Sequence, residues 1–415
     1  MHALTRRTFL MRSSVACLGL ALSAPENMVR GESAAVFDSH AGTSSRDRPL
    51  TLFLAGDVMT GRGVDQILPH PVDPRLHEAY VKRADTYVRL AEAKHGRIPT
   101  PVPYPYVWGE ALDELARVRP DARIVNLETA VTTSNDWWRG KGIHYRMHPA
   151  NVPVLTAADL DVCVLGNNHV MDWGHTGLRE TLAVLRAAGL RTAGAGLDRE
   201  EAAAPAVLET RTGRVLVFSY GTPDAGVPPA WAAGTNRPGV NLLPALDARG
   251  ARQVIDAVRT HRHTGDRVVV SLHWGANWGY AIPPAQRDFA HRLVDAGAAD
   301  VIHGHSSHHP KGIEVYRRRP ILYGAGDLIN DYEGIEGYEA FRSNLRLLYF
   351  PALDENGALL SLEMVPVQIR RFRLERAPEA AVHWLAEVLD RESRRFGTRV
   401  EVTPRGRLAL RWNTP

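Results

Sequence analysis

Seven short apolar runs, each of a length suited to a β-strand, alternate with amphipathic stretches from residue 50 onward. The stretches Gly177–Ala188, Ala248–Arg262 and Pro284–Ala296 repeat their apolar residues every three or four positions, which is typical of helices that cover a sheet. This alternation predicts an α/β fold. The strand-like runs are Leu50–Ala55, Arg123–Leu127, Val162–Leu165, Val215–Ser219, Val268–Leu272, Val301–Ile302 and Ile321–Tyr323.

A group that can bind a metal or transfer a proton follows five of these runs. Ligands of open α/β sheets bind beyond the carboxyl ends of the strands, so these groups are expected to share one pocket. Each residue alone has an ordinary structural explanation, such as a turn cap or an ion pair, but the joint pattern indicates a site. The sequences at the strand ends are Gly56-Asp57-Val58-Met59, Asn126-Leu127-Glu128, Gly166-Asn167-Asn168-His169, His273-Trp274-Gly275 and His303-Gly304-His305-Ser306-Ser307-His308-His309.

The donor atoms in this pattern suit a divalent transition metal, because carboxylate and amide oxygens occur together with imidazole nitrogens. Only Cys163 remains after the first 24 residues, which excludes a site of several thiolates within one chain. We therefore expect one or two divalent ions, with manganese, iron and zinc as candidates. Such an ion polarises a phosphoryl or carbonyl oxygen, or lowers the pKa of a bound water towards about 7.

Several longer motifs lie at the same positions, namely GDVM, NLET, NNHVMDWG, TAGAG, LHWG, and GHSSHH followed by GIEVY. Through them the chain resembles, from about Leu50 to Ile369, the CapA-type bacterial capsule (poly-gamma-glutamate) synthesis family. That family is similar to the calcineurin-like metallophosphoesterases. The resemblance implies a sandwich of two mixed sheets flanked by helices, with the site at one sheet edge.

The resemblance also implies roles for individual residues. It implies that His169 handles a proton beside the metal as a general acid, and that Asp57 and His308 take part in catalysis. The metal ligands that it implies are Asp57, Glu128, Asn168, His273, His305 and His308.

Four residues, in three motifs, depart from the family patterns. Met59 stands where phosphoesterases have a histidine, so one imidazole ligand is missing, and Ser306-Ser307 replaces a His-Pro pair. Asp327 stands where the family commonly has asparagine and adds a carboxylate near the site. These departures leave open two metal sites of unequal strength, a single metal site, or a metal-free acid–base site.

Basic residues near these motifs are candidates for binding an anionic substrate, since guanidinium and ammonium groups pair with carboxylates and phosphates. We expect this role for Arg62, Lys141 and Arg146. Asp172 is instead expected to cap the helix that begins near His175–Gly177. Residues 66–108 and 137–148 read as long loops that form lids or binding surfaces.

Three functions fit these residues. The first is an exported enzyme of the capsule-synthesis type, a hydrolase or transferase that acts with a metal on a phosphoester or on an amide of an anionic polymer or peptide. The second is an epimerase or isomerase, in which Asp57 and an imidazole exchange a proton at a peptide Cα. The missing ligand at Met59 favours this second function. The third is a non-catalytic envelope protein that binds a polymer.

The first 24 residues resemble a twin-arginine signal peptide, with Arg6-Arg7 before a short apolar run. They predict export by the twin-arginine machinery to the periplasm, the cell envelope or the medium, with no transmembrane segment in the mature protein. Residues 25–47 are expected to be a linker, 48–370 the main domain, and 371–415 a terminal helix, Glu379–Arg394, with an extended tail. The net charge of +4 includes these two arginines and Arg12, so it gives no support for a nucleic-acid partner.

Overall fold

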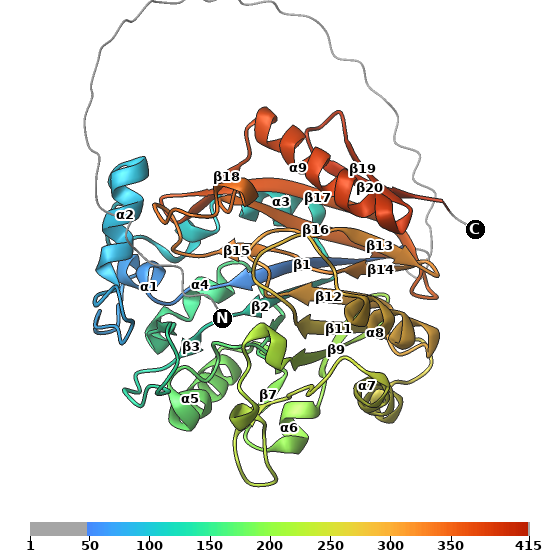
Figure 1. The fold of residues 1–415 in the computed structure, drawn as a ribbon, viewed down its shortest axis with the longest axis horizontal. Coiled ribbons are helices and arrows are strands. Elements are labelled where there is room, and N and C mark those ends of the chain that lie inside the picture. Colours follow the sequence, from blue (N-terminus) through green and yellow to red (C-terminus); the bar gives the residue numbers. More distant parts are fainter. Residues whose placement is uncertain (1–47, 414–415) are drawn as a thin grey trace, which may run out of the picture. The chain divides into compact units, whose positions relative to one another are not determined.

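Two mixed β-sheets form the framework of residues 48–413, the part of the chain that the computed structural model describes. Helices lie around these sheets (Figure 1). The predicted α/β class with two main mixed sheets is therefore confirmed. The residues expected to form the signal peptide and the linker, 1–24 and 25–47, lie outside the described part.

The larger sheet has ten strands and contains the first motif. Its parallel part joins the strands β1, β2, β5 and β6, and the remaining strands of its main path run antiparallel to their neighbours. The order along the sheet is β19 (Thr398–Val402), β20 (Leu408–Trp412), β17 (Leu359–Arg370), β16 (Leu345–Leu353), β1 (Leu50–Val58), β2 (Ala122–Leu127), β5 (Val162–Val164) and β6 (Arg191–Ala193). In addition, β15 (Asp327–Ile329) pairs with β1, and β18 (Arg373–Arg376) pairs with β17.

The second sheet has six strands and contains the two histidine motifs. Four of its strands, β9, β11, β12 and β14, are parallel. The order is β13 (Ile313–Tyr316), β14 (Arg319–Leu322), β12 (Val301–His305), β11 (Arg267–His273), β9 (Gly213–Gly221) and β8 (Ala206–Thr210). Two further strand pairs join β3 (Ala130–Val131) with β4 (Arg146–Met147), and β7 (Ala195–Gly196) with β10 (Gly239–Val240).

Four helices lie where the sequence predicts them, with ends that differ by at most three residues; these are α5 (Gly174–Ala187), α7 (Ala248–His261), α8 (Pro284–Asp295) and α9 (Glu379–Ser393). The other α-helices are α1 (Gly63–Ile67), α2 (Asp85–His95), α3 (Ala111–Val118), α4 (Pro153–Thr156) and α6 (Arg199–Ala203). Short 3-10 helices are η1 (Tyr104–Val107), η2 (Pro149–Asn151), η3 (Pro223–Ala225), η4 (Pro229–Trp231), η5 (Glu339–Phe341) and η6 (Arg394–Phe396).

The core shows why the sheets stack. Side chains of a strand alternate between its two faces, and in β1 Leu52 and Leu54 join a cluster shared with Val217 and Val269 of the other sheet. Phe53 lies on the opposite face of β1, in a cluster that includes residues of α1 to α5. A third cluster joins the outer face of the six-stranded sheet to α7 and α8. Buried apolar layers on both faces of both sheets therefore hold the sandwich together.

Two expected segments differ from the structure. Residues 66–108, expected to be a loop, contain α2, whose Tyr87 and Ala91 are buried one helical turn apart. The tail expected to be extended is the hairpin of β19 and β20, and β20 pairs with β17 of the large sheet. The C-terminal residues are thus part of the main sheet.

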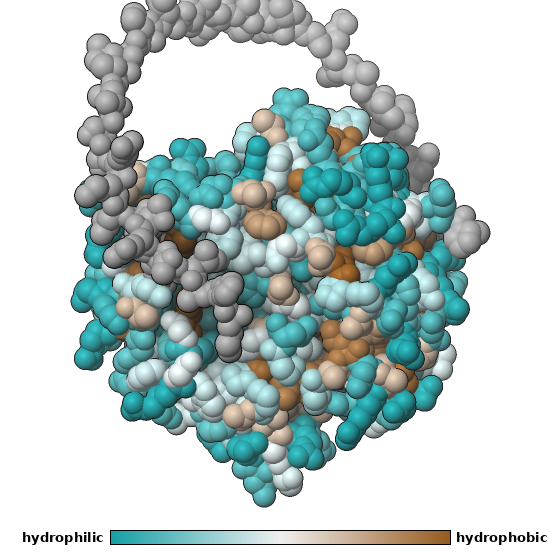
Figure 2. Space-filling view, in the orientation of Figure 1, coloured by the Kyte–Doolittle hydropathy of each residue, from teal (hydrophilic) through white to brown (hydrophobic). Residues whose placement is uncertain are grey.

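The molecular face shown in Figure 2 is mainly hydrophilic, and its hydrophobic residues lie in small separate groups. Among residues 48–413, the structure has no helix with the length and apolar composition needed to cross a bilayer.

Candidate metal and acid–base site

The carboxyl ends of parallel strands from both sheets meet at one site. Asp57 lies near the end of β1, and Glu128 directly follows β2. His273 and His305 are the last residues of β11 and β12. All four side chains are buried, with at most 2% of each residue exposed. β12 is longer than its predicted apolar run because it includes both His303 and His305.

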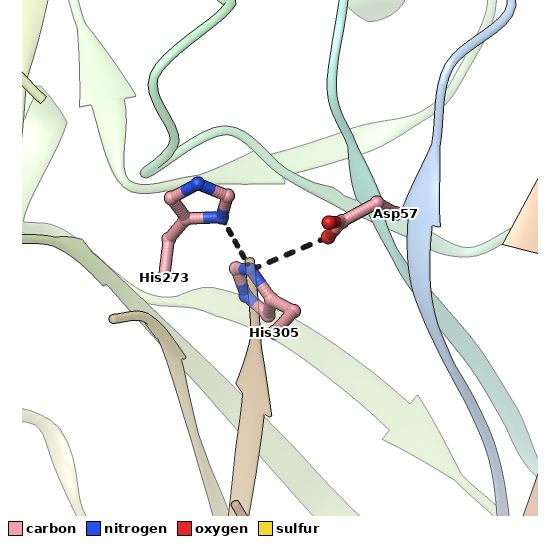
Figure 3. Close-up of side chains that lie close together, drawn as sticks. All are labelled: Asp57, His273 and His305. Carbon is pink, nitrogen blue, oxygen red and sulfur yellow. Dashed lines mark hydrogen bonds and ion pairs between the residues drawn. The ribbon is translucent and has the colours of Figure 1, made fainter. Parts of the chain in front are cut away.

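The first cluster of this site consists of Asp57, His273 and His305, whose side chains converge in Figure 3. The Nδ1 atoms of the two histidines lie 2.9 Å apart, and His305 Nδ1 lies 3.8 Å from Asp57 Oδ1. Glu128 borders the same cluster, because its Oε2 lies 3.8 Å from His273 Nδ1. Two ligands of one transition-metal ion, each about 2.1 Å from it, have separations in this range.

Two asparagines that sequence analysis did not single out hold the carboxylates in place. The Nδ2 group of Asn126 donates to Asp57 Oδ1 at 2.8 Å and to Glu128 Oε2 at 2.9 Å. Asn167 Nδ2 in turn donates to Asn126 Oδ1 at 2.9 Å. Asn126 belongs to the NLET motif and Asn167 to the NNHVMDWG motif. Their position in these motifs, close to Glu128 and Asn168, is the sequence feature that could have identified them.

A second cluster shares Asp57 with the first and adds His308 and Asp327. His308 Nδ1 lies 2.9 Å from Asp327 Oδ1, and Asn330 donates to Asp327 Oδ2 at 2.6 Å. Burial disfavours the charge on both groups, but their mutual attraction lowers the pKa of Asp327 and raises the pKa of His308. His308 thus lies outside the first cluster, on the Asp327 side of Asp57.

His169 forms a dyad with Asp172, the residue that was expected to cap a helix. The Nδ1 atom of His169 lies 2.6 Å from Asp172 Oδ2, and Tyr145 N–H donates to the same oxygen at 2.7 Å. The prediction for Asp172 was wrong, since the residue at the start of α5 is Trp173 and no side chain caps that end. The other ring nitrogen of His169 lies 3.8 Å from Glu128 Oε1, so the dyad adjoins the carboxylates.

Of the three basic residues expected to bind substrate, only Lys141 lies at this site. Its ammonium group contacts Asp172 Oδ1, the carbonyl oxygen of Asn168 and, at 2.9 Å, His169 Nδ1. The loop 137–148 therefore carries a cation onto the dyad, rather than presenting it to solvent. His169 and Lys141 together lower the pKa of Asp172, although burial opposes this.

Arg62 and Arg146 form contacts within the protein, so the prediction that they bind substrate was wrong. Arg62 is 2% exposed, and it donates to both oxygens of Asp331 and to Glu78. The Arg146 guanidinium lies 3.8 Å from the centre of the Trp173 ring and donates to the Ser134 carbonyl oxygen. Groups that are buried with these partners are not free to bind a substrate from solvent.

Unpaired buried atoms indicate what the site accommodates. Asp57 Oδ2 and Asn168 Oδ1 are buried without a hydrogen-bond partner, an arrangement that costs stability unless something else binds them. Burial also lowers the pKa of His273 and His305 well below the usual value, which keeps both imidazoles neutral. Neutral imidazole is the form that ligates a metal. These donors fit a divalent cation bound by oxygen and nitrogen.

The charge of the carboxylates supports the same conclusion. Burial, and next the charge of Asp327, raise the pKa of Asp57 to about 7. Burial and the neighbouring Asp57 raise the pKa of Glu128 well above its usual value. A bound cation would stabilise both ionised carboxylates.

In the metal-free protein, we expect the contribution of Asp57 to the free energy of unfolding to fall as the pH rises from about 4 to about 7. The pKa of Asp57 rises from 3.8 to about 7 on folding. The folded state therefore binds more protons in this range, and this stabilisation is lost as the pH passes through the folded pKa. Urea unfolding of chelator-treated protein at several pH values measures the effect.

The comparison is with Asp57→Asn, in which the buried histidines with lowered pKa are unchanged. The free energy of unfolding of the unsubstituted chain minus that of the variant should fall as the pH rises through this window. Addition of zinc or manganese at a pH just above neutral should raise the melting temperature of the unsubstituted chain. A difference between the two proteins that does not change with pH over this window would show that Asp57 is already compensated within the protein.

Comparisons with known proteins agree with the motifs. Residues 51–332 match the family described as bacterial capsule synthesis protein PGA_cap. A probable polyglutamine synthesis accessory protein of Mycobacterium tuberculosis (strain ATCC 25618 / H37Rv) is 49% identical over 358 residues, which cover 86% of this chain and 94% of that relative. The capsule biosynthesis protein CapA of Bacillus anthracis is 26% identical over 322 residues, 77% of this chain and 68% of the relative.

A solved structure that resembles the chain is the 5'-nucleotidase precursor from Thermus thermophilus. It has a TM-score of 0.44 and 16% sequence identity, and the match covers 82% of this chain and 58% of that one. The family assignment rests on the match over residues 51–332 and on the mycobacterial relative. The chain belongs to the PGA_cap family of bacterial capsule synthesis proteins.

Proposed function

We propose that this chain is a metal-dependent hydrolase or transferase that acts on a phosphoester or a glutamyl amide bond of an anionic polymer or its precursor. The observation that carries the proposal is the buried cluster of Asp57, His273 and His305, whose donor atoms all lie within 4.8 Å of one another. A proton-transfer dyad, His169 with Asp172, adjoins this cluster through Glu128. A purely structural site has no need for both features together.

Asp57, His273 and His305 would hold the first ion, with Glu128 and Asn168 beside them. When bound there, the ion would polarise a phosphoryl or carbonyl oxygen and lower the pKa of an attacking water. Asn168 Oδ1 is available as a supporting ligand, since this oxygen is buried without a hydrogen-bond partner.

His169 would move the proton. Burial lowers its pKa to about 4, so its resting form is the neutral imidazole. With Nδ1 donating its proton to Asp172, the other ring nitrogen accepts a proton from the nucleophile before it donates one to the leaving group. The general-acid step expected from the family thus follows a general-base step. Lys141 would keep Asp172 ionised and the imidazole in this orientation.

The names of the relatives support a substrate rich in carboxylates or amides. The mycobacterial relative is called a polyglutamine synthesis accessory protein, and a relative from Bacillus subtilis (strain 168), 31% identical over 245 residues, is called a PGA biosynthesis protein. Polymers of glutamate carry carboxylates, and polymers of glutamine carry amides. Both kinds of group match a cationic, oxygen-binding centre.

The test is an assay of metal-loaded protein on three chromogenic substrates: a phosphomonoester, a phosphodiester and a γ-glutamyl anilide. We expect turnover of one class, its loss on chelation, and its recovery on addition of manganese or zinc. Turnover that is unaffected by complete metal removal would contradict the proposal. If a glutamyl peptide instead gains deuterium at Cα from heavy water without hydrolysis, the epimerase function is correct.

We also propose that the chain is exported by the twin-arginine machinery and acts in the cell envelope or outside the cell. The support is the sequence of residues 1–24, with the pair Arg6-Arg7 before an apolar run. The test is cell fractionation of the unsubstituted chain and of the double variant Arg6→Lys with Arg7→Lys. The double variant should remain in the cytoplasm, because it lacks the arginine pair. An unchanged distribution would refute this route of export.

A further inference from the structure

Asp327 lies directly beside Asp57, although the two residues are far apart in the sequence. Strands β1 and β15 are parallel, and their register places Asp57 opposite Asp327. Gly56 permits this approach, because a Cβ atom at that position would lie only 1.8 Å from the Gly326 carbonyl oxygen. The Asp57 N–H donates to the same carbonyl oxygen at 3.1 Å. The backbone therefore holds two buried carboxylates next to each other.

His308 completes a set of three donors around this pair. Its Nδ1 atom lies 2.9 Å from Asp327 Oδ1, and the donor atoms of Asp57, His308 and Asp327 all lie within 4.8 Å of one another. Asn330 donates to the second oxygen of Asp327 and orients the carboxylate, as the hydrogen-bond partners of metal ligands commonly do. Asp57 belongs to both three-donor clusters, so it lies between them.

Met59 occupies the position at which an imidazole ligand is missing from this chain. It lies two residues after Asp57, is 1% exposed, and its backbone N–H donates to the Ile329 carbonyl oxygen of β15. Its sulfur lies 3.7 Å from the Tyr332 hydroxyl, and the Tyr332 ring packs edge-on against the ring of His308. The Met59 side chain therefore lies near His308, with Tyr332 in contact with both. A thioether sulfur is a poor ligand for a hard divalent cation. Asp327 supplies a carboxylate to this neighbourhood.

The local charge leaves room for a cation. Asp57, Glu128 and Asp327 are three buried carboxylates, and Arg346 is a buried guanidinium whose charge acts on Asp327 and Asp57. The carboxylates outnumber this guanidinium by two charges, which one divalent ion balances. A second ion makes the site positive, and an anionic substrate would neutralise that charge.

We propose that Asp327, with His308 and the shared carboxylate of Asp57, binds a second divalent ion, and that Asp327 takes over the role of the imidazole that the chain lacks at position 59. This inference rests on the metal site of the proposed function. The second cluster has two carboxylates and one imidazole, whereas the first has two imidazoles and one carboxylate, with Glu128 and Asn168 as further oxygen donors. Oxygen-rich sites favour manganese, whereas imidazole-rich sites favour zinc or iron.

The experiment uses the full chain, stripped of metal and loaded with manganese alone. We expect two ions per chain by elemental analysis, and an electron paramagnetic resonance spectrum broadened by magnetic coupling, because the ions share Asp57. Asp327→Ala should bind one ion, with an uncoupled six-line spectrum, and should weaken the second site at least about 100-fold. Asp327→Asn, which keeps the shape and removes the charge, should give an intermediate affinity.

The matched control is Asp295→Asn, the same chemical change at a carboxylate in α8 that pairs with Arg317 on the surface. It should retain two coupled ions. The single ion retained by Asp327→Ala shows that this variant is folded. One uncoupled ion in the unsubstituted chain, or two ions in Asp327→Ala, would overturn the inference. A chain with two coupled ions but no turnover would refute the proposed function and leave this inference standing.

Discussion

Replacing His273 with alanine is expected to remove the ion of the first cluster and to lower metal-dependent turnover by at least about 100-fold. His273 is 1% exposed, and its Nδ1 atom lies 2.9 Å from the Nδ1 atom of His305, so the two imidazoles face the same point. Changes at groups that only orient metal ligands typically cost about 10- to 100-fold in affinity or activity, and loss of a ligand costs at least as much. Elemental analysis and titration with zinc measure the loss directly.

His303→Ala is the matched control for this variant. His303 is buried on β12, close to the cluster, and like His305 it contacts the Ser271 hydroxyl. It belongs to neither donor cluster. This variant should keep its metal and its turnover, although it loses some stability. If His273→Ala retained a full complement of metal, the assignment of the first cluster would be wrong.

Replacing Arg62 with alanine is expected to lower the free energy of unfolding by about 3–5 kcal/mol, because the change leaves buried charges unpaired. Arg62 donates to Asp331 through two nitrogens and to Glu78 through a third, and it lies over the Tyr87 ring. Glu78 and Asp331 are themselves buried, so neither can turn to water after the substitution. Equilibrium unfolding in urea measures the loss.

Arg75→Ala provides the comparison for Arg62. Its ion pair with Asp73 is exposed, with 78% of the arginine side chain accessible, and exposed pairs contribute about 0–1 kcal/mol. Arg62→Lys should recover only part of the stability, since an ammonium group cannot replace the planar fork of the guanidinium. Unchanged stability with weakened substrate binding in Arg62→Ala would instead restore the role expected from the sequence.

Much of the fold was predictable because its signals are local. The short apolar run of β1 and the period near 3.6 in α7 are properties of single strands and helices, which a stretch of about ten residues already displays. The segment that contains α2 was missed because prolines and aromatic residues surround it. The hairpin of β19 and β20 was missed because an edge strand shows its nature only when it pairs with β17.

Most of the residues that form the candidate site were also predictable from the sequence. Asp57, Glu128, His273 and His305 lie at the ends of parallel strands, and such strands deliver their ends to one edge of a sheet. The role of Asp172 could not be predicted from the sequence. An aspartate just before a helix looks the same in sequence whether it caps that helix or contacts His169. Only the packing of the loop 137–148 brings Lys141 and the Tyr145 N–H onto it.

The sequence by itself determined seven central strands, four helices, the family, and the set of polar groups at the strand ends. The strands are β1, β2, β5, β9, β11, β12 and β14, and the helices are α5, α7, α8 and α9. The tertiary structure alone decided which charges face each other. Arg62 meets Asp331 across 269 positions of the chain, and Asp57 meets Asp327 only because β15 pairs with β1. The physical reason is that periodicity and turn chemistry act between near neighbours, whereas the partner of a buried charge depends on how remote segments pack, and the cost of leaving such a charge unpaired makes that choice decisive.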